Sequence, residues 1–168
     1  MVKDLVNGKE WKEPLRLDLG CGPWIREGFI GIDIRNFWEG NKIKDYEVKA
    51  DIFCDLNKGI PFPDNSIDQI NMGHFLEHVA NPYNMLDECI RVLQPNGVID
   101  IVVPLNEIYS PDHITSFYSE WFDRNIHLEG AYFKGRLWIV SKEIYLENLE
   151  KEQRAIWILK IRLGVDKR

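Results

Sequence analysis

Cysteine is scarce in this chain, which has three cysteines among 168 residues. None belongs to a Cys-X-X-Cys pair, so the spacing gives no support for a zinc ribbon, an iron–sulfur cluster or a redox dithiol. An odd number of scattered thiols in apolar surroundings is typical of buried, reduced cysteines. We therefore expect a reducing compartment and predict a cytoplasmic protein.

Long apolar runs and excess basic charge are missing as well. No stretch approaches the roughly 20 residues of a membrane-spanning helix, and residues 1–10 are too charged for a signal peptide. The formal net charge is −6, which argues against nucleic acid as the partner. The length fits a single domain, residues 1–168, with a core of its own.

The most informative segment that is present is LRLDLGCGPWIREGFIGIDI, residues 15–34. Leu15–Leu19 and Phe29–Ile34 predict two buried strands, and Gly20-Cys21-Gly22 predicts a tight turn after the first. Ligands of open α/β sheets bind at this edge, where glycine lets them approach the backbone. Asp33, near the end of the second strand, is placed to accept hydrogen bonds from both ribose hydroxyls.

The turn lacks the third glycine of a dinucleotide site. That fingerprint opens a full helix and places an acid about 20 residues on, whereas Asp33 follows Gly20 by 13 residues (33 − 20). Residues 23–28 leave room for about a turn and a half of helix, too little to bind a pyrophosphate. Asp18 would repel phosphate and suits a cationic ligand. We therefore predict S-adenosylmethionine, which carries a sulfonium and no phosphate.

Strands alternate with helices or long crossovers further along the chain. Strands are predicted at Val48–Cys54, Ile67–Met72 and Val98–Val103, the last nearly all apolar like a strand buried on both sides. A helix is predicted after Asn81, which is a suitable N-cap. This order predicts an α/β fold with a doubly wound, mostly parallel sheet.

The C-terminal third is predicted to add an antiparallel strand and a helix. Arg136–Val140 predicts the strand, paired with a neighbour near Gly130–Phe133. Residues 142–163 predict the helix. Its expected apolar face includes Leu146, Leu149, Ile156 and Leu159.

Ordered motifs between Asp51 and Leu105 give the chain a family resemblance. They are IPFPDNSID, HFLEHV and RVLQPNGV. Together with LDLGCG and GIDI, they closely resemble the class I S-adenosylmethionine-dependent methyltransferases, especially the type 11 group. The resemblance covers residues 15–122. It implies the Rossmann-like methyltransferase fold, with S-adenosyl-L-methionine as cofactor and S-adenosyl-L-homocysteine as product.

The resemblance also implies roles for residues at the strand ends. The first motif would line the methionine end of the cofactor, Asp33 would hold the ribose, and Asp55 would bind the adenine amino group. Residues 71–78 would pass beneath the methyl donor. The cofactor-binding residues implied are Asp18, Gly20, Cys21, Gly22, Asp33, Ile34, Asp55, Leu56 and Asn71.

The candidate catalytic residues are His113, Asp112 and His74. In related enzymes a histidine before an aromatic cluster lies over the acceptor site, and Asp112-His113 occupies that region here. The pair could take a proton from a hydroxyl or amine, and a structural turn is the alternative. His74 and His78 would share a helix face, but no clear third ligand accompanies them, so no metal site is predicted.

The predicted activity is methyl transfer to a small molecule or to a modified sugar or lipid-linked acceptor. One alternative is an RNA or protein methyltransferase, against which the acidic charge counts. Another is a non-catalytic subunit that binds S-adenosylmethionine. Only 14 residues precede the first predicted strand and offer little lid. A homodimer that completes the site is therefore also open.

Overall fold

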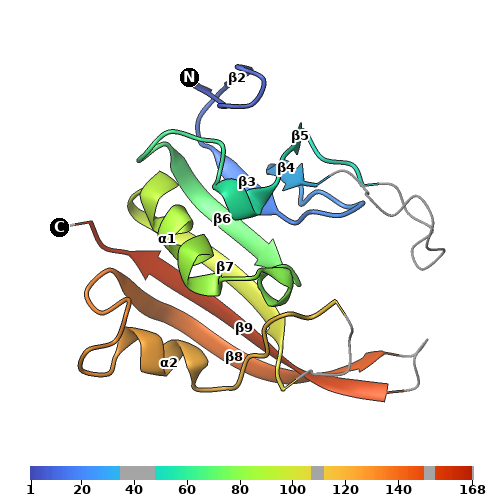
Figure 1. Ribbon diagram of the computed structural model, residues 1–168, viewed down its shortest axis with the longest axis vertical. Coiled ribbons are helices and arrows are strands. Elements are labelled where there is room, and N and C mark those ends of the chain that lie inside the picture. Colours follow the sequence, from blue (N-terminus) through green and yellow to red (C-terminus); the bar gives the residue numbers. More distant parts are fainter. Residues whose placement is uncertain (35–47, 107–111, 150–153, 168) are drawn as a thin grey trace.

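The computed structural model describes residues 1–34, 48–106, 112–149 and 154–167 (Figure 1). Its main sheet has the strand order β5-β4-β3-β6-β7-β9-β8, and β1 and β2 form a small antiparallel sheet of their own. The strands are β1 Val2–Lys3, β2 Glu10–Trp11, β3 Arg16–Leu19, β4 Ile30–Asp33, β5 Ile52–Phe53, β6 Ile67–Gly73, β7 Leu93–Pro104, β8 Leu137–Leu149 and β9 Arg154–Val165. The helices are α1 Pro82–Val92 and α2 Trp121–Ile126, with 3₁₀ turns η1 Leu56–Lys58 and η2 Leu76–His78.

The centre of the sheet is parallel. β3 pairs in parallel with β4 on one side and with β6 on the other, and β5 and β7 extend these two halves. The chain therefore reverses its direction of winding at β3, which places the ligand crevice of such sheets at the carboxyl end of this strand. The predicted fold class is confirmed, including the antiparallel C-terminal strand, because β8, which contains most of the predicted strand Arg136–Val140, runs antiparallel to β9.

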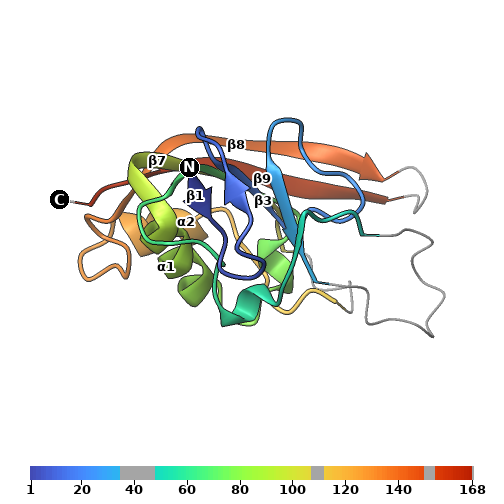
Figure 2. The same cartoon turned by 90° about the horizontal axis from the view of Figure 1, so that it is seen from above.

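The described helices lie on one side of the sheet (Figure 2). β7 shows the consequence in its alternating burial. Ile99 and Ile101 are buried beneath the helices, whereas Asp100 and Val102 are half-buried on the opposite face. The burial expected on both faces of this strand therefore holds for one face only.

Helix α1 begins at the predicted cap. The side chain of Asn81 accepts hydrogen bonds from the backbone N–H groups of Tyr83 and Asn84, at 3.0 and 3.2 Å. Pro82 occupies the first turn, where its missing N–H costs nothing. A cap of this kind stabilises a helix by about 1 kcal/mol, so the start of α1 is specified locally.

Arg91 ties the other end of α1 to the loop after β5. Its Nη2 donates to the carbonyl of Ile60 at 2.8 Å, and its Nη1 donates to the carbonyl of Phe62 at 2.9 Å. Nε and Nη2 also donate to the two carboxylate oxygens of Glu88, each at 2.8 Å. One guanidinium thus fixes the loop that follows the strand ends.

The C-terminal third is a β-hairpin and not the predicted helix. β8 pairs antiparallel with β9 from Leu137↔Val165 to Leu149↔Arg154, so the predicted pairing of Arg136–Val140 with residues near Gly130 is also wrong. In β9, buried Leu159, Ile161 and Leu163 alternate with more exposed Lys160 and Arg162. This period of two defines a strand with one buried face, and it prevailed over the weaker helical period.

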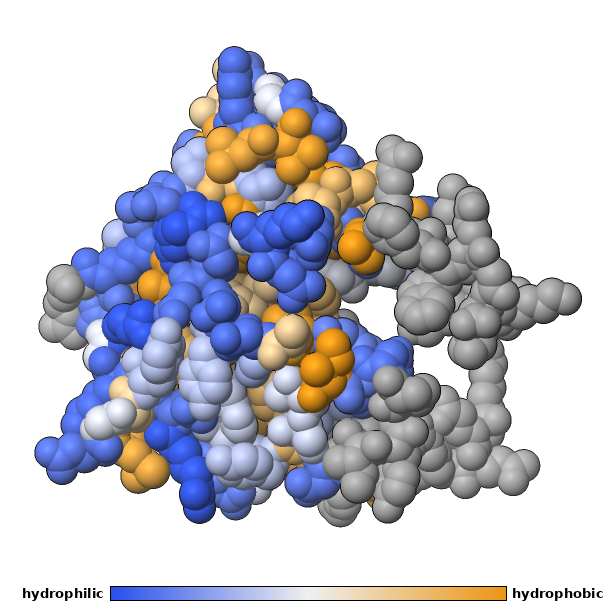
Figure 3. Space-filling view, in the orientation of Figure 1, coloured by the Kyte–Doolittle hydropathy of each residue, from blue (hydrophilic) through white to orange (hydrophobic). Residues whose placement is uncertain are grey.

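The surface over α1 and α2 is largely hydrophilic, with apolar residues in small groups (Figure 3). Among the described residues, no helix is both long and apolar enough to cross a membrane. Beneath this surface, Phe117, Trp121 and Phe122 pack on one another with ring centroids 4.8–6.0 Å apart. These aromatic side chains are buried and form part of the core.

Candidate functional site

The glycine turn connects β3 to β4 without a helix. Residues 21–29 contain turns and bends only, so the short helix considered for residues 23–28 is absent. Gly20 and Gly22 both have positive φ, +66° and +58°, a conformation that favours glycine. A Cβ at Gly20 would lie 2.2 Å from Cδ2 of Phe75, whereas a Cβ at Gly22 would meet no described atom within 4 Å. The turn is closed on one side by Phe75 and open at Gly22.

Asp33 joins the end of β4 to this turn. Its Oδ2 accepts a hydrogen bond from the backbone N–H of Gly22 at 2.8 Å, and its Oδ1 accepts one from the N–H of Ile34 at 2.7 Å. A carboxylate offers about four lone-pair sites, and the described residues occupy two of them. The backbone N–H of Cys54 donates to the carbonyl of Asp33 at 3.0 Å. The ends of β4 and β5 therefore meet beside the turn.

Asp18 organises the same turn from beneath. It is 5% exposed, and its Oδ2 accepts a hydrogen bond from the backbone N–H of Arg26 at 2.8 Å. Its Oδ1 accepts one from the side-chain amide of Asn71 at 2.6 Å, and Asn71 in turn accepts one from Arg26 Nη1 at 2.8 Å. The ends of β3 and β6 are thus joined by a polar network that underlies the glycine turn.

Asp55 caps η1 at the neighbouring strand end. Its Oδ1 accepts hydrogen bonds from the backbone and side-chain nitrogens of Asn57 at 3.0 and 3.2 Å. Leu56 is buried, at 7% exposure. The structure therefore brings together the strand ends that carry the predicted cofactor residues, along one edge of the sheet.

Cys21 is a packing residue in this turn. It is 8% exposed, and burial raises the pKa of its thiol to about 12. A Cβ at Gly31 would lie 2.9 Å from its sulfur and 2.6 Å from the side chain of Ile25. The glycine in β4 therefore makes room for the turn to fold back over the strand, and Cys21 fills part of that space.

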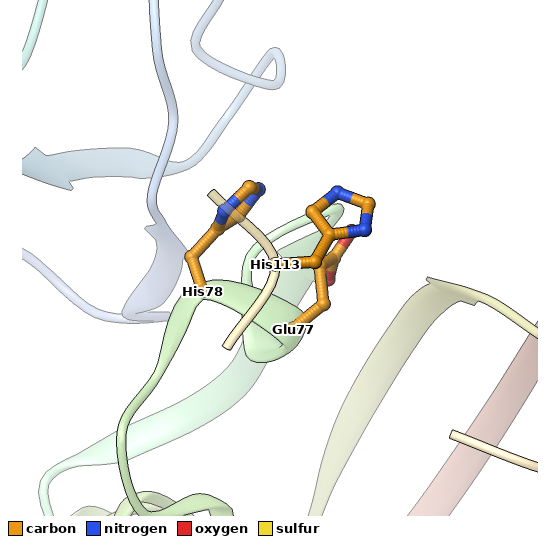
Figure 4. A group of neighbouring side chains, drawn as sticks. All are labelled: Glu77, His78 and His113. Atoms are coloured by element: carbon orange, nitrogen blue, oxygen red, sulfur yellow. The ribbon is translucent and has the colours of Figure 1, made fainter. Parts of the chain in front are cut away.

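The turn η2 follows β6 at the same edge and carries a second cluster. Glu77 is 1% exposed, and both its carboxylate oxygens lack a hydrogen-bond partner among the described residues. Nδ1 of His74 lies 3.4 Å from Glu77 Oε1, and this neighbour raises the pKa of His74. One ligand atom each from Glu77, His78 and His113 lie within 4.8 Å of one another (Figure 4).

Asp112 lies against His78 in this cluster. The carbonyl of Asp112 is 2.9 Å from Nδ1 of His78, and its Oδ2 is 3.8 Å from the same nitrogen. The ring of His113 stands edge-on to that of His78, with centroids 4.9 Å apart. Nδ1 of His113 is buried and lacks a hydrogen-bond partner among the described residues. The predicted acid–base pair would favour a hydrogen bond between Asp112 and His113. The structure shows no such bond between these two described residues at Nδ1 of His113.

His74 and His78 do not share a helix face, because His74 precedes η2 and has a φ of +53°. Glu77 is the residue of this cluster that sequence reasoning missed. Its side chain is recognisable as unusual only once its burial is known. The signal available in the sequence was the spacing HxxEH, which was set aside because the third ligand comes from a distant loop.

A parallel sheet whose strand ends carry a glycine turn and carboxylates defines an α/β protein that binds a nucleoside-containing cofactor. The comparisons make this class specific. A family model described as a methyltransferase domain matches residues 17–101, half of the chain. The chain belongs to this family, the type 11 methyltransferase domains.

One curated relative matches part of the chain. The ubiquinone/menaquinone biosynthesis C-methyltransferase UbiE of Desulfotalea psychrophila is 36% identical over an alignment of 61 residues that covers 34% of this chain. The match spans 24% of that protein, about a quarter of its length.

Solved structures show the same fold at low sequence identity. An S-adenosylmethionine-dependent methyltransferase of Methanosarcina mazei superposes with a TM-score of 0.63 at 16% identity, covering 91% of this chain and 92% of that one. The YcgJ protein of Bacillus subtilis superposes with a TM-score of 0.61 at 14% identity and the same coverage. The likeness to these structures shows the fold alone.

Proposed function

We propose that this protein transfers the methyl group of S-adenosylmethionine to a small molecule or to a modified sugar or lipid-linked acceptor. The observation that supports this most directly is the hydrogen bond from Gly22 N–H to Asp33 Oδ2, 2.8 Å long. It places a carboxylate beside an open glycine at the switch point of the sheet. The two hydroxyls of a ribose bound there would donate charge-assisted hydrogen bonds to the lone pairs of Asp33 that the described residues leave unoccupied.

The other cofactor contacts follow from the positions of the strand ends. The adenine would lie toward Asp55 and Leu56, after β5, and the methionine end toward Gly20, after β3, and Asn71, near the end of β6. Cys21, Gly22 and Ile34 would contribute backbone atoms around the ribose. Asp18 would act through the turn, because its two oxygens already accept hydrogen bonds from Arg26 and Asn71.

The reaction needs orientation more than activation. A lone pair of the acceptor forms a bond to the methyl carbon while the carbon–sulfur bond breaks and leaves its electron pair on sulfur. The sulfonium becomes the neutral thioether of S-adenosylhomocysteine, and a proton of the acceptor passes to solvent. Holding donor and acceptor in line is the principal contribution that a protein makes here. We propose that His74, Asp112 and His113 border the acceptor, since η2 lies at the same edge as Gly20.

The acceptor class rests on charge and on size. A net charge of −6 disfavours a long polyanion, so RNA is the weaker alternative. We propose that residues 1–168 act as one methyltransferase domain, alone or as a homodimer, which sedimentation would distinguish. The three cysteines are free thiols, and we propose on this ground a cytoplasmic site of action.

Titration calorimetry with S-adenosylmethionine, S-adenosylhomocysteine and NADH tests this function. We expect both adenosyl ligands to bind and NADH not to bind. Asp33→Ala removes two hydrogen bonds to the ribose, each to a charged group, and should weaken binding by about 100-fold or more. Glu129→Gln is the matched control, because Glu129 is an exposed acid remote in sequence from the turn.

The outcomes separate the parts of the proposal. Binding of NADH and of neither adenosyl ligand would refute the function. Unchanged affinity in Asp33→Ala would refute the assignment of the ribose, even if S-adenosylmethionine binds. Normal cofactor binding without turnover on any small acceptor, but with turnover on RNA, would favour the alternative.

A further inference from the structure

Glu77 carries a buried carboxylate that the described residues compensate only weakly. Its side chain is 1% exposed, yet neither oxygen has a hydrogen-bond partner among the described residues. Burying a charge without good hydrogen bonds costs several kcal/mol. The nearest described cationic group is Nδ1 of His74, 3.4 Å from Oε1, which is longer than an ordinary N–H···O hydrogen bond. A cation at this position would supply the missing partner.

His78 is prepared as a ligand by its own hydrogen bond. Its Nδ1 lies 2.9 Å from the backbone carbonyl of Asp112, which can only accept. The neutral imidazole therefore carries its proton on Nδ1 and keeps the lone pair of Nε2 free. Histidine ligands of metals are held in this way, with the second ring nitrogen donating to a carbonyl or carboxylate. The tautomer of His78 thus suits metal binding.

His113 reaches the cluster from a distant loop that is firmly docked. The backbone N–H groups of Ile114 and Thr115 both donate to the carbonyl of Glu77, at 2.9 and 3.0 Å. The hydroxyl of Thr115 donates to the carbonyl of Val79 at 3.1 Å. His113 therefore stands beside Glu77 because the loop is fixed there, and Figure 4 shows both side chains on the same side of η2 as His78.

We propose that Glu77, His78 and His113 bind a divalent first-row transition metal ion. Two imidazoles and one carboxylate form a donor set found in catalytic Zn²⁺ sites and in non-haem Fe²⁺ sites, and this set leaves a coordination position open. Their ligand atoms lie within 4.8 Å of one another. Metal–ligand bonds of about 2.0–2.1 Å require neighbouring ligand atoms about 3.4 Å apart. Small side-chain rotations would shorten the spacing of the ligand atoms to this value. His74, whose Nδ1 lies 3.4 Å from Oε1 of Glu77, would support the carboxylate of Glu77.

The open position gives the ion a role in the proposed reaction, and this part rests on the proposed function. Phe75, two residues before Glu77, packs against Gly20 in the turn that would hold the methionine end of the cofactor. The ion would therefore lie on the acceptor side of the methyl donor. It would bind an oxygen of the acceptor and orient it, so the acceptor class is one with a hydroxyl that can ligate a metal.

Metal binding is tested directly on untagged protein that has been treated with EDTA and dialysed. We expect one equivalent of Zn²⁺ by calorimetry and one equivalent of Co²⁺ by its visible absorption. His113→Ala and Glu77→Gln should each weaken Zn²⁺ binding about 100-fold or more, since even outer partners of metal ligands contribute 10–100-fold. His127→Ala is the control, because His127 is an exposed histidine at the end of α2, and its affinity should equal that of the wild type.

Thermal melts keep the test independent of folding defects. Without metal, Glu77→Gln should melt at or above the wild-type temperature, because it removes a buried charge that has no hydrogen bond among the described residues and only the 3.4 Å contact with His74. Zn²⁺ should raise the melting temperature of the wild type and leave that of Glu77→Gln unchanged. A metal-free Glu77→Gln that melts lower would instead identify Glu77 as a structural residue and overturn the proposal, as would Zn²⁺ binding that survives both substitutions.

S-adenosylmethionine binding, measured on the same samples, separates the two proposals. Retained cofactor binding without Zn²⁺ binding would refute the metal site and leave the proposed function intact. Zn²⁺ binding without cofactor binding would refute the function and keep the site.

Discussion

Gly20 is the position where the structure predicts the largest loss from the smallest change. Gly20→Ala adds one methyl group at a residue whose φ is +66°, in the left-handed region. That conformation costs an L-residue about 1–2 kcal/mol. The added Cβ would also lie 2.2, 2.7 and 2.9 Å from the Cδ2, Cγ and Cβ atoms of Phe75. Three contacts of this kind cannot be relieved by rotating one flexible end, because Cβ of Phe75 is itself among them.

Forcing extra volume into a packed site costs about 1–3 kcal/mol. Together with the backbone term, Gly20→Ala should lower the free energy of unfolding by about 2–5 kcal/mol. For a chain of this length, 1 kcal/mol corresponds to about 2–4 °C in melting temperature, so a central loss of about 3 kcal/mol predicts a decrease of about 6–12 °C. Urea unfolding followed by circular dichroism gives the free energy, and calorimetry gives the melting temperature.

Gly130→Ala is the matched control for this prediction. Gly130 has a φ of +74°, and a Cβ there would meet no described atom within 4 Å. It should therefore lose the backbone term only, about 1–2 kcal/mol. In a Phe75→Ala background, Gly20→Ala should cost less than in the wild type, because the contacts with Cδ2 and Cγ are gone and only the 2.9 Å contact with Cβ remains. Equal losses for Gly20→Ala and Gly130→Ala in the wild-type background would show that Phe75 does not constrain the turn.

Two further predictions concern ionisation. Burial raises the pKa of Cys21 to about 12 and that of Cys54 to about 11. A thiol reagent at pH 8 should therefore modify both cysteines slowly in the native protein and rapidly in urea. Fast labelling of the native protein would contradict the burial of these thiols. The hydrogen bonds from Arg91 lower the pKa of Glu88, so their stabilisation is complete above the unfolded pKa of about 4.3 and is lost as pH falls through the lower native value. Glu88→Gln should flatten this acid limb of the unfolding free energy, and an unchanged slope would refute the link.

The strand ends could be predicted from the sequence because their signals are local. The glycine turn, the acid at the end of β4 and the cap Asn81 each depend on residues within a few positions of one another. The parallel sheet followed from their order along the chain. The C-terminal hairpin could not be predicted from local signals, because its apolar residues fit a helical period and a strand period equally. Pairing of β9 with β7, from Val98↔Gly164 to Pro104↔Ile158, decided between them.

The cluster around Glu77 lay beyond sequence reasoning for a different reason. His113 is 35 residues from His78 (113 − 78), and the loop that brings it back is held by backbone hydrogen bonds to the carbonyl of Glu77. Hydrogen bonds between backbone groups do not depend on the side chains, so the sequence does not reveal them. The burial of Glu77 is likewise a tertiary property, since a charged residue after an apolar pair is ordinarily placed in solvent.

The predicted cofactor carboxylates also hold the turn that stands in place of a helix. Even a helix after β3 would leave its first four backbone N–H groups without intrahelical partners. In this chain Asp33 accepts a hydrogen bond from the N–H of Gly22 and Asp18 accepts one from the N–H of Arg26, so two side chains satisfy the backbone of the turn. Asp33→Ala should therefore loosen the turn as well as remove a ribose contact. Asp33→Asn separates the two effects, because its amide oxygen can keep one backbone hydrogen bond while the charge that would bind the ribose is lost.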